Sequence, residues 1–250
     1  MSTAALFALA FVVAGAFFTE AVVGFGATVL TVSFGAQIVP MEVILPAFVP
    51  LNIALSALVI ARNFPRVDTP VLVRRIGPAV AVGAAVGMQL TALQGDRRIL
   101  VAFALFVCLV GLAELRRSVS QRPSAPLPAG ASMALLGMGG LVHGLFGAGG
   151  PLIVYAAARL VPERSAFRAT LAVVWCALNL ALVVNYARLG MLSAQSLRIT
   201  GVLIPSLAVG AWVGEWAHTR VPGRAFRVAT AMLLVAAGGS LALRTLLGAG

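Results

Sequence analysis

Long apolar segments recur along the whole chain and constrain its fold more than any other feature. A helix needs roughly 20 apolar residues to cross about 30 Å of hydrocarbon. Six segments of 17 to 19 residues approach this length: Ile44–Ala61, Ile76–Leu93, Ile99–Leu115, Ala169–Ala187, Ile199–Ala217 and Phe226–Leu243. With 61% hydrophobic and only 10% charged residues, the chain has too little polar surface for a soluble globule of its size. The sequence therefore predicts an all-α polytopic membrane protein whose solvent is a lipid bilayer.

The formal net charge of +11 does not indicate a nucleic-acid-binding protein. All 18 basic residues are arginines, and they lie in short clusters between the apolar segments, a pattern typical of membrane topology. Cys108 and Cys176 both lie inside apolar segments without a partner spacing, so we expect packing residues, no disulfide, no metal site and no cofactor. Residues 1–3 carry no basic side chain, which predicts a retained membrane segment rather than a cleaved signal peptide.

Two further apolar stretches are too long for one straight crossing. Ala4–Val39 has 36 residues and Ala129–Val161 has 33, so as single helices they would reach about 50 Å. Small residues interrupt both stretches near the middle, as Gly24-Phe25-Gly26-Ala27 and as Gly147-Ala148-Gly149-Gly150-Pro151. Glycine lets the backbone turn and proline suits the first turn of a new helix. Each stretch is therefore predicted to form a hairpin of two short helices.

The two halves of the chain are copies of each other. The segment Ala81–Gly87 recurs 127 residues later as Ala208–Gly214, and at this offset Asn52 corresponds to Asn179. Upstream the offset is 123 residues, which pairs the first glycine of one break with the first glycine of the other. We expect a first transmembrane repeat at residues 1–117, a cytoplasmic linker at 118–128 and a second repeat at 129–250. The Gly-x-x-x-Gly spacing inside the repeated segment predicts close contact between helix backbones.

The distribution of the arginines predicts the topology. If each long stretch is a hairpin, 13 arginines fall on one side of the membrane and five on the other: Arg97, Arg98, Arg188, Arg198 and Arg244. The arginine-rich side is predicted to be cytoplasmic, with both termini extracytoplasmic. An odd number of passes per half inverts the second repeat, as in many secondary transporters. We expect 8 to 10 membrane segments, since the count does not separate fully crossing hairpins from re-entrant ones.

The glycine breaks are the first candidates for a binding site. Backbone amides at a helix start, together with the positive end of the helix dipole, attract anions. The candidate substrate-binding residues are Gly24, Phe25, Gly26, Ala27 and Thr28 at the first break and Gly147, Ala148, Gly149 and Gly150 at the second. Two inverted breaks are expected to meet near the middle of the membrane. The alternative is that these glycines only allow close helix packing.

Glu20 and His143 correspond at the 123-residue offset, and each lies four residues before the first glycine of its break. They are the only ionisable residues deep within the two hairpins, where such groups usually face a cavity or a proton relay. We expect them to take part in proton coupling; a buried pair without a transport role is the alternative. Asn52 and Asn179, related by the repeat, complete the substrate-binding candidates. Like Thr28, Thr31 and Gln89 they are weaker candidates than the glycine breaks, because such groups also hold helices together.

The residues around the breaks resemble a known family. Glu20–Ala27, of sequence EAVVGFGA, and His143–Pro151, of sequence HGLFGAGGP, are similar to the glycine-rich signature of the TauE/SafE sulfite exporter family. The resemblance implies a bacterial inner-membrane transporter of sulfite, sulfoacetate or another small sulfur-containing or organic anion. It also implies export driven by the proton gradient. The second break is closer to the family pattern than the first, where Ala27-Thr28 replaces Gly150-Pro151.

These expectations combine into a secondary transporter in the bacterial cytoplasmic membrane, with a small anion, protons and lipid as its partners. Uptake of a related anion and an anion channel are the alternatives within transport. An intramembrane enzyme that uses Glu20 and His143 as acid and base is the alternative from another class. No nucleophile or ligand set lies beside them in the sequence, so we expect no enzymatic activity. A homodimer is left open.

Overall fold

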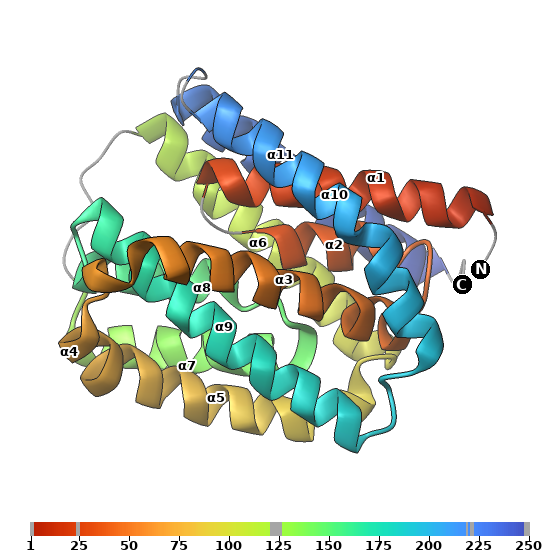
Figure 1. Ribbon diagram of the computed structural model, residues 1–250, viewed down its shortest axis with the longest axis horizontal. Helices are drawn as coiled ribbons and strands as arrows, with labels where there is room; N and C mark the ends of the chain where they lie inside the picture. The colour runs from red at the N-terminus through yellow and green to blue at the C-terminus, as the bar shows by residue number, and fades with distance from the viewer. Residues whose placement is uncertain (1–2, 24–25, 121–126, 219, 221–222, 248–250) are drawn as a thin grey trace. The chain divides into compact units, whose positions relative to one another are not determined.

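The computed structural model describes residues 3–23, 26–120, 127–218, 220 and 223–247 (Figure 1). Every regular element in these ranges is a helix, and eight helices are long and apolar enough to cross a membrane. The all-α polytopic fold is therefore confirmed. The helices form two compact units, one from residues 1–44, 93–123 and 201–250, called unit 1, and one from 45–92 and 124–200, called unit 2. Each unit is described by itself.

Unit 1 contains the first hairpin and the ends of both halves. Its helices are α1 (Thr3–Val23), α2 (Ala27–Gly35), α6 (Arg97–Ser120), α11 (Gly223–Leu247) and the larger part of α10 (Ala194–His218). Helices α6 and α11 pack along their length. A Cβ on Gly111 of α6 would press on Ala231 and Val235, and one on Gly238 of α11 would press on Ala104 and Cys108. The two contacts are the same contact made twice, at the 127-residue offset.

Unit 2 contains the second hairpin. Its helices are α4 (Thr69–Val71), α5 (Gly77–Gln89), α7 (Ala129–Phe146), α8 (Gly150–Leu160), α9 (Arg164–Arg188) and most of α3 (Met41–Asn63). Short 3₁₀ turns cover Phe64–Arg66 and Thr91–Leu93, and a π-helical turn at Leu72–Ile76 leads into α5. The core of this unit joins α5, α7, α8 and α9 through the buried side chains of Ile76, Val80, Leu136, Ile153, Leu171 and Val174.

Both apolar stretches break at the predicted glycines, but only the second helix of each is short, whereas α1 and α7 are long enough to cross a membrane. Helix α1 ends at Val23 and α2 begins at Ala27; helix α7 ends at Phe146 and α8 begins at Gly150. Helix α2 has nine residues and α8 has eleven, so they rise only about 14 Å and 17 Å. Neither is long enough to cross about 30 Å of hydrocarbon as a helix.

The repeated glycines bring helix backbones together in both units. In unit 2, a Cβ on Gly83 of α5 would collide with the carbonyl oxygen of Gly137 on α7. In unit 1, a Cβ on Gly210 of α10 would collide with the carbonyl oxygen of Ala14 on α1. The partners correspond at the 127- and 123-residue offsets, so the predicted close contact of the Gly-x-x-x-Gly segments is confirmed. The inverted relation of the repeats and the bounds of 1–117 and 129–250 stay predictions.

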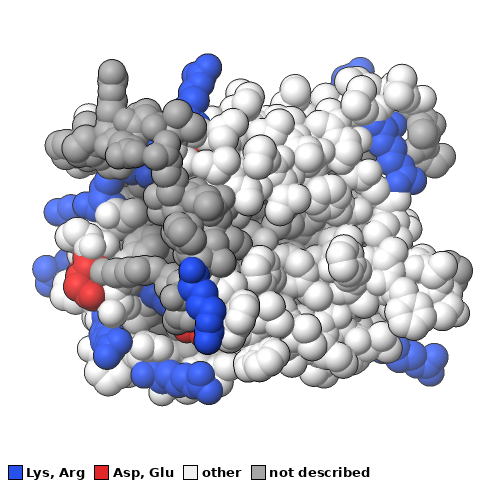
Figure 2. Space-filling model, turned by 90° about the horizontal axis from the view of Figure 1, so that it is seen from above, with Lys and Arg blue, Asp and Glu red and all other residues white. Residues whose placement is uncertain are grey.

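Large apolar side chains stand exposed on these helices. Phe11 is 82% exposed, Trp212 74% and Leu109 66%. Contact of so many large apolar side chains with water would be unfavourable. Figure 2 shows a surface on which uncharged residues predominate, with a few blue arginines and very few red carboxylates. Such a surface suits lipid, and the chain is a multi-pass membrane protein.

Candidate functional site

The second break is built by glycines whose geometry excludes a side chain. Gly147 ends α7 with a φ of 65°, in the left-handed region, and its N–H donates to the His143 carbonyl oxygen at 2.6 Å. A Cβ on Gly149 would lie 2.8 Å from the main-chain nitrogen of His143. The start of α8 therefore lies against the turn of α7 that carries His143. Pro151 occupies the first turn of α8, as predicted.

His143 lies in a buried cluster between α7 and α9. Its side chain is 2% exposed, and its ring stacks on Trp175 with centroids 5.7 Å apart and planes 17° apart. The Asn179 side chain, also 2% exposed, lies near the imidazole. Within the described residues neither ring nitrogen of His143, nor the amide oxygen of Asn179, has a partner with full hydrogen-bond geometry. His143 and Asn179 are therefore neighbours whose polar atoms are not aligned for a hydrogen bond.

The first break is closed by a side chain. Gly26, the N-cap of α2, has a φ of 110°. The Ala27 N–H donates to Oε2 of Glu20 at 3.0 Å, across the break. The Glu20 carboxylate therefore lies at the start of α2, where a bound anion would lie. Gly24 and Phe25, both predicted substrate-binding residues, lie outside the described residues.

The two breaks thus differ in what occupies the helix start. Glu20 caps α2 with a carboxylate, whereas no side chain caps α8 in the described residues. His143, the counterpart of Glu20 in the second repeat, contacts Trp175 instead. Local sequence alignment could pair Glu20 with His143, but it could not show that only one of them reaches a backbone amide.

The positions of the remaining predicted residues say less about their roles. Asn52 on α3 is 4% exposed and shares unit 2 with Asn179, and Thr31 on α2 is fully buried. Thr28 is buried on the first turn of α2, next to the Ala27 amide. Gln89 is exposed, so it does not line a buried site.

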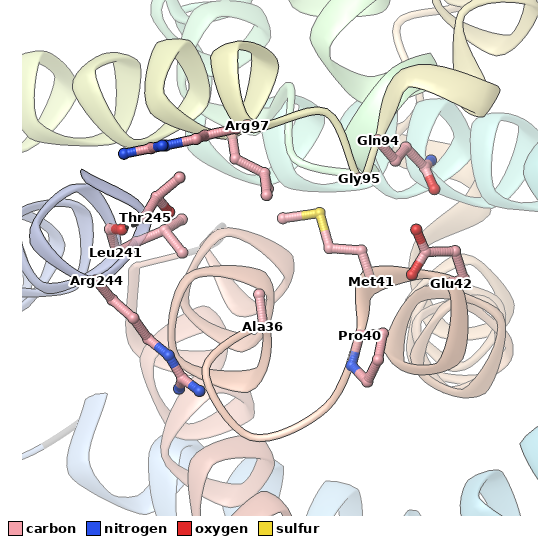
Figure 3. A pocket seen from close by; sticks show the side chains of 11 residues that line it. Ala36, Pro40, Met41, Glu42, Gln94, Gly95, Arg97, Leu241, Arg244 and Thr245 are labelled. Carbon is pink, nitrogen blue, oxygen red and sulfur yellow. Dashed lines mark hydrogen bonds between the residues drawn. The ribbon is translucent and has the colours of Figure 1, made fainter. Parts of the chain in front are cut away.

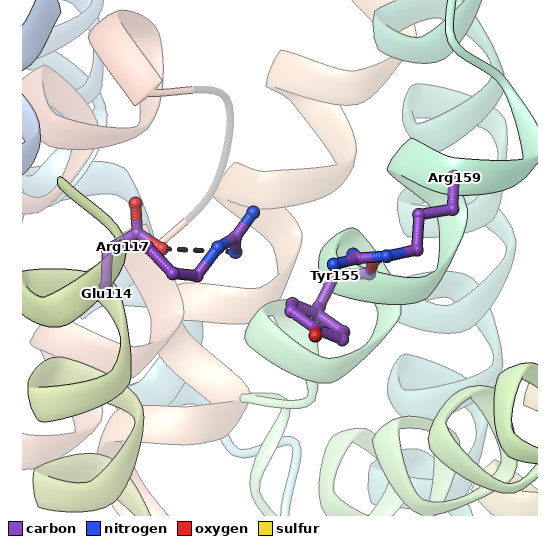
Figure 4. A network of polar contacts seen from close by, with 4 residues as sticks. All are labelled: Glu114, Arg117, Tyr155 and Arg159. Carbon is purple, nitrogen blue, oxygen red and sulfur yellow. Dashed lines mark hydrogen bonds and ion pairs between the residues drawn. The ribbon is translucent and has the colours of Figure 1, made fainter. Parts of the chain in front are cut away.

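Tyr155 and Arg159 on α8 form a polar contact that was not predicted from the sequence. The Arg159 guanidinium lies 3.8 Å above the centre of the Tyr155 ring, and it donates to the Tyr155 carbonyl at 2.6 Å (Figure 4). Their spacing of four residues on an expected helix was the only available signal. Trp175, which stacks on His143, also lies at the site. Trp212 and Trp216 are exposed on α10, and Arg220 stacks on Trp216.

Comparison with known proteins decides the family. The family model described as sulfite exporter TauE/SafE matches residues 7–241. The chain belongs to the TauE/SafE family. A curated relative, the "Probable inner membrane transporter protein TsaS" of Comamonas testosteroni, is 30% identical over 165 residues, which cover 66% of this chain and 68% of the relative. No solved structure gives a significant match.

Membership of the TauE/SafE family confirms the predicted resemblance and the general function. The chain is a membrane transporter with a small anion as its substrate, and it is not an enzyme. The intramembrane enzyme is therefore no longer a candidate.

Proposed function

We propose that this transporter exports a small sulfur-containing anion, such as sulfite or an organosulfonate, across the bacterial inner membrane in exchange for protons. The family description and the name of the relative support the direction, the cargo and the location. The single structural observation behind the proposal is the helix start at Gly150, which has no side-chain cap and adjoins the turn carrying a buried histidine.

The start of α8 supplies the groups that an oxyanion needs. The first turn of a helix offers main-chain N–H donors and the positive end of the helix dipole. Gly147, Ala148, Gly149 and Gly150 form the backbone of this site, and Asn179 and Asn52 are the polar side chains assigned to it. A buried polar atom without an aligned partner, as on Asn179, favours a ligand that completes its hydrogen bonding.

Proton coupling is assigned to Glu20 and His143, each within its own unit. An ionised Glu20 occupies the start of α2 as an internal anion, and protonation removes that negative charge. His143 gains a positive charge on protonation, and exchange requires that it has released this proton before the anion is carried outward. Export by exchange requires that the proton-loaded form returns inward without the anion.

The Glu20–Ala27 hydrogen bond also favours a second candidate function. If a protonated Glu20 releases the start of α2 to the anion, proton and anion bind together. Joint binding makes the protein a symporter, and an inward proton gradient would then drive uptake. The two functions differ in the sign of the response to a pH gradient.

Flux through purified protein in liposomes tests the proposal. The probes are labelled sulfite and labelled methanesulfonate, a strong-acid anion whose charge does not change with pH. Exchange predicts that outside acidification accelerates efflux from loaded vesicles. Inward accumulation under the same gradient would establish symport instead, and a flux that ignores the gradient would identify a channel.

Two conservative variants test the proton-carrying residues. Glu20→Gln keeps an oxygen for the Ala27 amide and imitates the protonated acid, and His143→Phe keeps the ring stack on Trp175 without a titratable nitrogen. We expect both variants to fold, as judged by gel filtration, and to lose the response to the pH gradient. If a variant keeps the full response to the pH gradient, the residue that it replaces takes no part in proton coupling.

A further inference from the structure

His143 is buried without an opposite charge beside it. Its side chain is 2% exposed, and it makes no ion pair with any described residue. The sequence of unit 2 contains only two acidic side chains, and both cap helix starts, Asp68 that of α4 and Glu163 that of α9. Glu42, which lines a cavity of about 420 Å³, belongs to unit 1 (Figure 3). Within unit 2 a protonated His143 therefore needs a partner other than a carboxylate.

The elements packed against α7 carry no negative charge either. These elements are α5, α8, α9 and the π-helical turn before α5. Helix α5 has no ionisable side chain, and α7 has none besides His143. The ionisable residues of the others are Arg74 and Arg75 on the turn, Tyr155 and Arg159 on α8, and Arg164, Arg168, Cys176, Tyr186 and Arg188 on α9. The charged groups among them are all arginines, which oppose a positive charge on the imidazole.

Trp175 lies where a counter-ion would be expected. Its ring stacks on the imidazole with centroids 5.7 Å apart and planes 17° apart. A cation within about 6 Å of an aromatic centroid is attracted by the negative face of the ring, and tryptophan attracts cations more strongly than tyrosine or phenylalanine. The attraction is larger where water is excluded, as it is around His143. The stack can therefore hold the imidazole in its charged form.

The two copies of the repeat differ in this aromatic residue. Each copy has an aromatic side chain four residues before its asparagine, Phe48 in the first and Trp175 in the second. The first copy carries Glu20 before its break and the second carries His143. The Glu20 carboxylate has a backbone amide as its partner. The stronger aromatic partner for a cation thus accompanies the residue that can become a cation.

Helix α5 fixes the main chain of α7 around His143. A Cβ on Gly140 or on Gly144 would collide with a carbonyl oxygen of α5. The turns on either side of His143 therefore lie against α5 with little room to shift. The rotamer of the histidine side chain can still vary, and Trp175 is the ring that it contacts. Trp175 is thus in a position to fix the imidazole.

We propose that Trp175 is a positioning residue for proton coupling, whose indole face holds the imidazolium of His143 and replaces a carboxylate counter-ion. The inference rests on the proposed function for the role of His143. The proton is taken up on a ring nitrogen of His143 and leaves from it, and no other covalent bond forms or breaks. The imidazole stays in the stack in both charge states.

Tryptophan fluorescence tests the stack directly. Replacing two exposed residues of α10, Trp212→Phe and Trp216→Phe, leaves Trp175 as the sole tryptophan of the chain. An imidazolium in contact with an excited indole transiently accepts an electron and quenches its emission, whereas a neutral imidazole does so far less. In lipid nanodiscs the Trp175 emission should fall reversibly on acidification, and this fall should be absent when His143→Phe is added. Emission that ignores pH, or that falls equally with His143→Phe, would overturn the proposal.

Flux in liposomes tests the positioning. Trp175→Leu removes the aromatic face and should abolish the response of anion flux to the pH gradient. Trp175→Phe keeps a weaker aromatic face and should retain part of the response. Phe48→Leu makes the matched change in the other copy and should leave the response intact. A full response in Trp175→Leu, or equal losses in Trp175→Leu and Phe48→Leu, would contradict the assigned role.

Folding of each variant is checked by gel filtration. If Trp175→Leu does not fold, the fluorescence result and the reduced response of Trp175→Phe decide the question, and an undiminished response in Trp175→Phe then counts against the proposal. The inference and the proposed function also fail separately. Acid quenching that depends on His143, without any effect of the gradient on flux, would reject proton coupling while confirming that the indole holds the imidazolium. A gradient response that needs His143 but not Trp175 would reject the role of Trp175 alone.

Discussion

The Cα of Gly210 lies so close to the carbonyl oxygen of Ala14 that any side chain at residue 210 would overlap that oxygen. Gly83 has the same relation to Gly137 in unit 2. Small residues at such crossings are how helices associate in lipid, where apolar area alone gives little preference for a neighbouring helix over an acyl chain.

Adding one methyl group at this crossing should destabilise the protein. We expect Gly210→Ala to cost about 1–3 kcal/mol, because the two backbones must move apart. Gly201→Ala is the control on the same helix, since a Cβ there meets nothing within 4 Å. Thermal unfolding in detergent, followed by gel filtration, measures both. Equal stability of the two variants would show that the close crossing is not a source of stability.

The effect of the second break on transport should be separable from its effect on stability. Gly147 and Gly190 have similar φ values of 65° and 69°, in the region that L-residues avoid. Alanine at either position should cost about 1–2 kcal/mol. Only Gly147→Ala should also lower the rate of anion flux, because it distorts the path into α8. Parallel flux loss in Gly190→Ala would mean that strain alone accounts for the effect.

The breaks could be predicted from sequence, but their contacts could not. Glycine pairs inside stretches of 36 and 33 residues pointed to the turns, and the positive φ values of Gly26 and Gly147 confirm them. The Glu20–Ala27 bond depends on how the hairpin closes, and seven residues across a break have no fixed geometry. Trp175 is brought to His143 only by the packing of α7 against α9.

The sequence repeat did not predict which helices contact each other. The glycines at 83 and 210 predicted a close backbone, because that follows from spacing alone. Which helix would supply the backbone depends on tertiary packing, which a local pattern does not encode.

The cap of α9 gives a pH-dependent stability. Glu163 accepts hydrogen bonds from the Ser165 and Ala166 N–H groups, which lower the pKa of its carboxyl below the ordinary value of about 4.5. Because the folded pKa is depressed, the stabilisation is present above that ordinary value and is lost as the pH falls through the lowered one. Glu163→Ala should therefore melt earlier than the unmodified protein at about pH 7, and the difference should shrink as the pH falls below the ordinary pKa. A pH-independent difference would contradict the assignment to the ionised cap.

Topology can be tested at two exposed positions. With Cys108 and Cys176 replaced by alanine, Pro40→Cys should react with an impermeant thiol reagent in intact cells. Arg66→Cys should react only after the membrane is opened. Pro40 follows α2 and Arg66 ends the turn after α3, so one helix separates them. The reverse labelling pattern would overturn the predicted orientation.

The composition of the two units sets an order for biosynthesis. Unit 2 ends at Thr200, whereas unit 1 draws on the first helix and the last. Unit 2 can therefore close while the chain is still on the ribosome, but α1 must wait in the bilayer for α10, and α6 for α11. Helix α1 contacts α2 at once but meets α10 only after most of the chain has been inserted, so truncation near the C-terminus leaves this hairpin without its contact with α10.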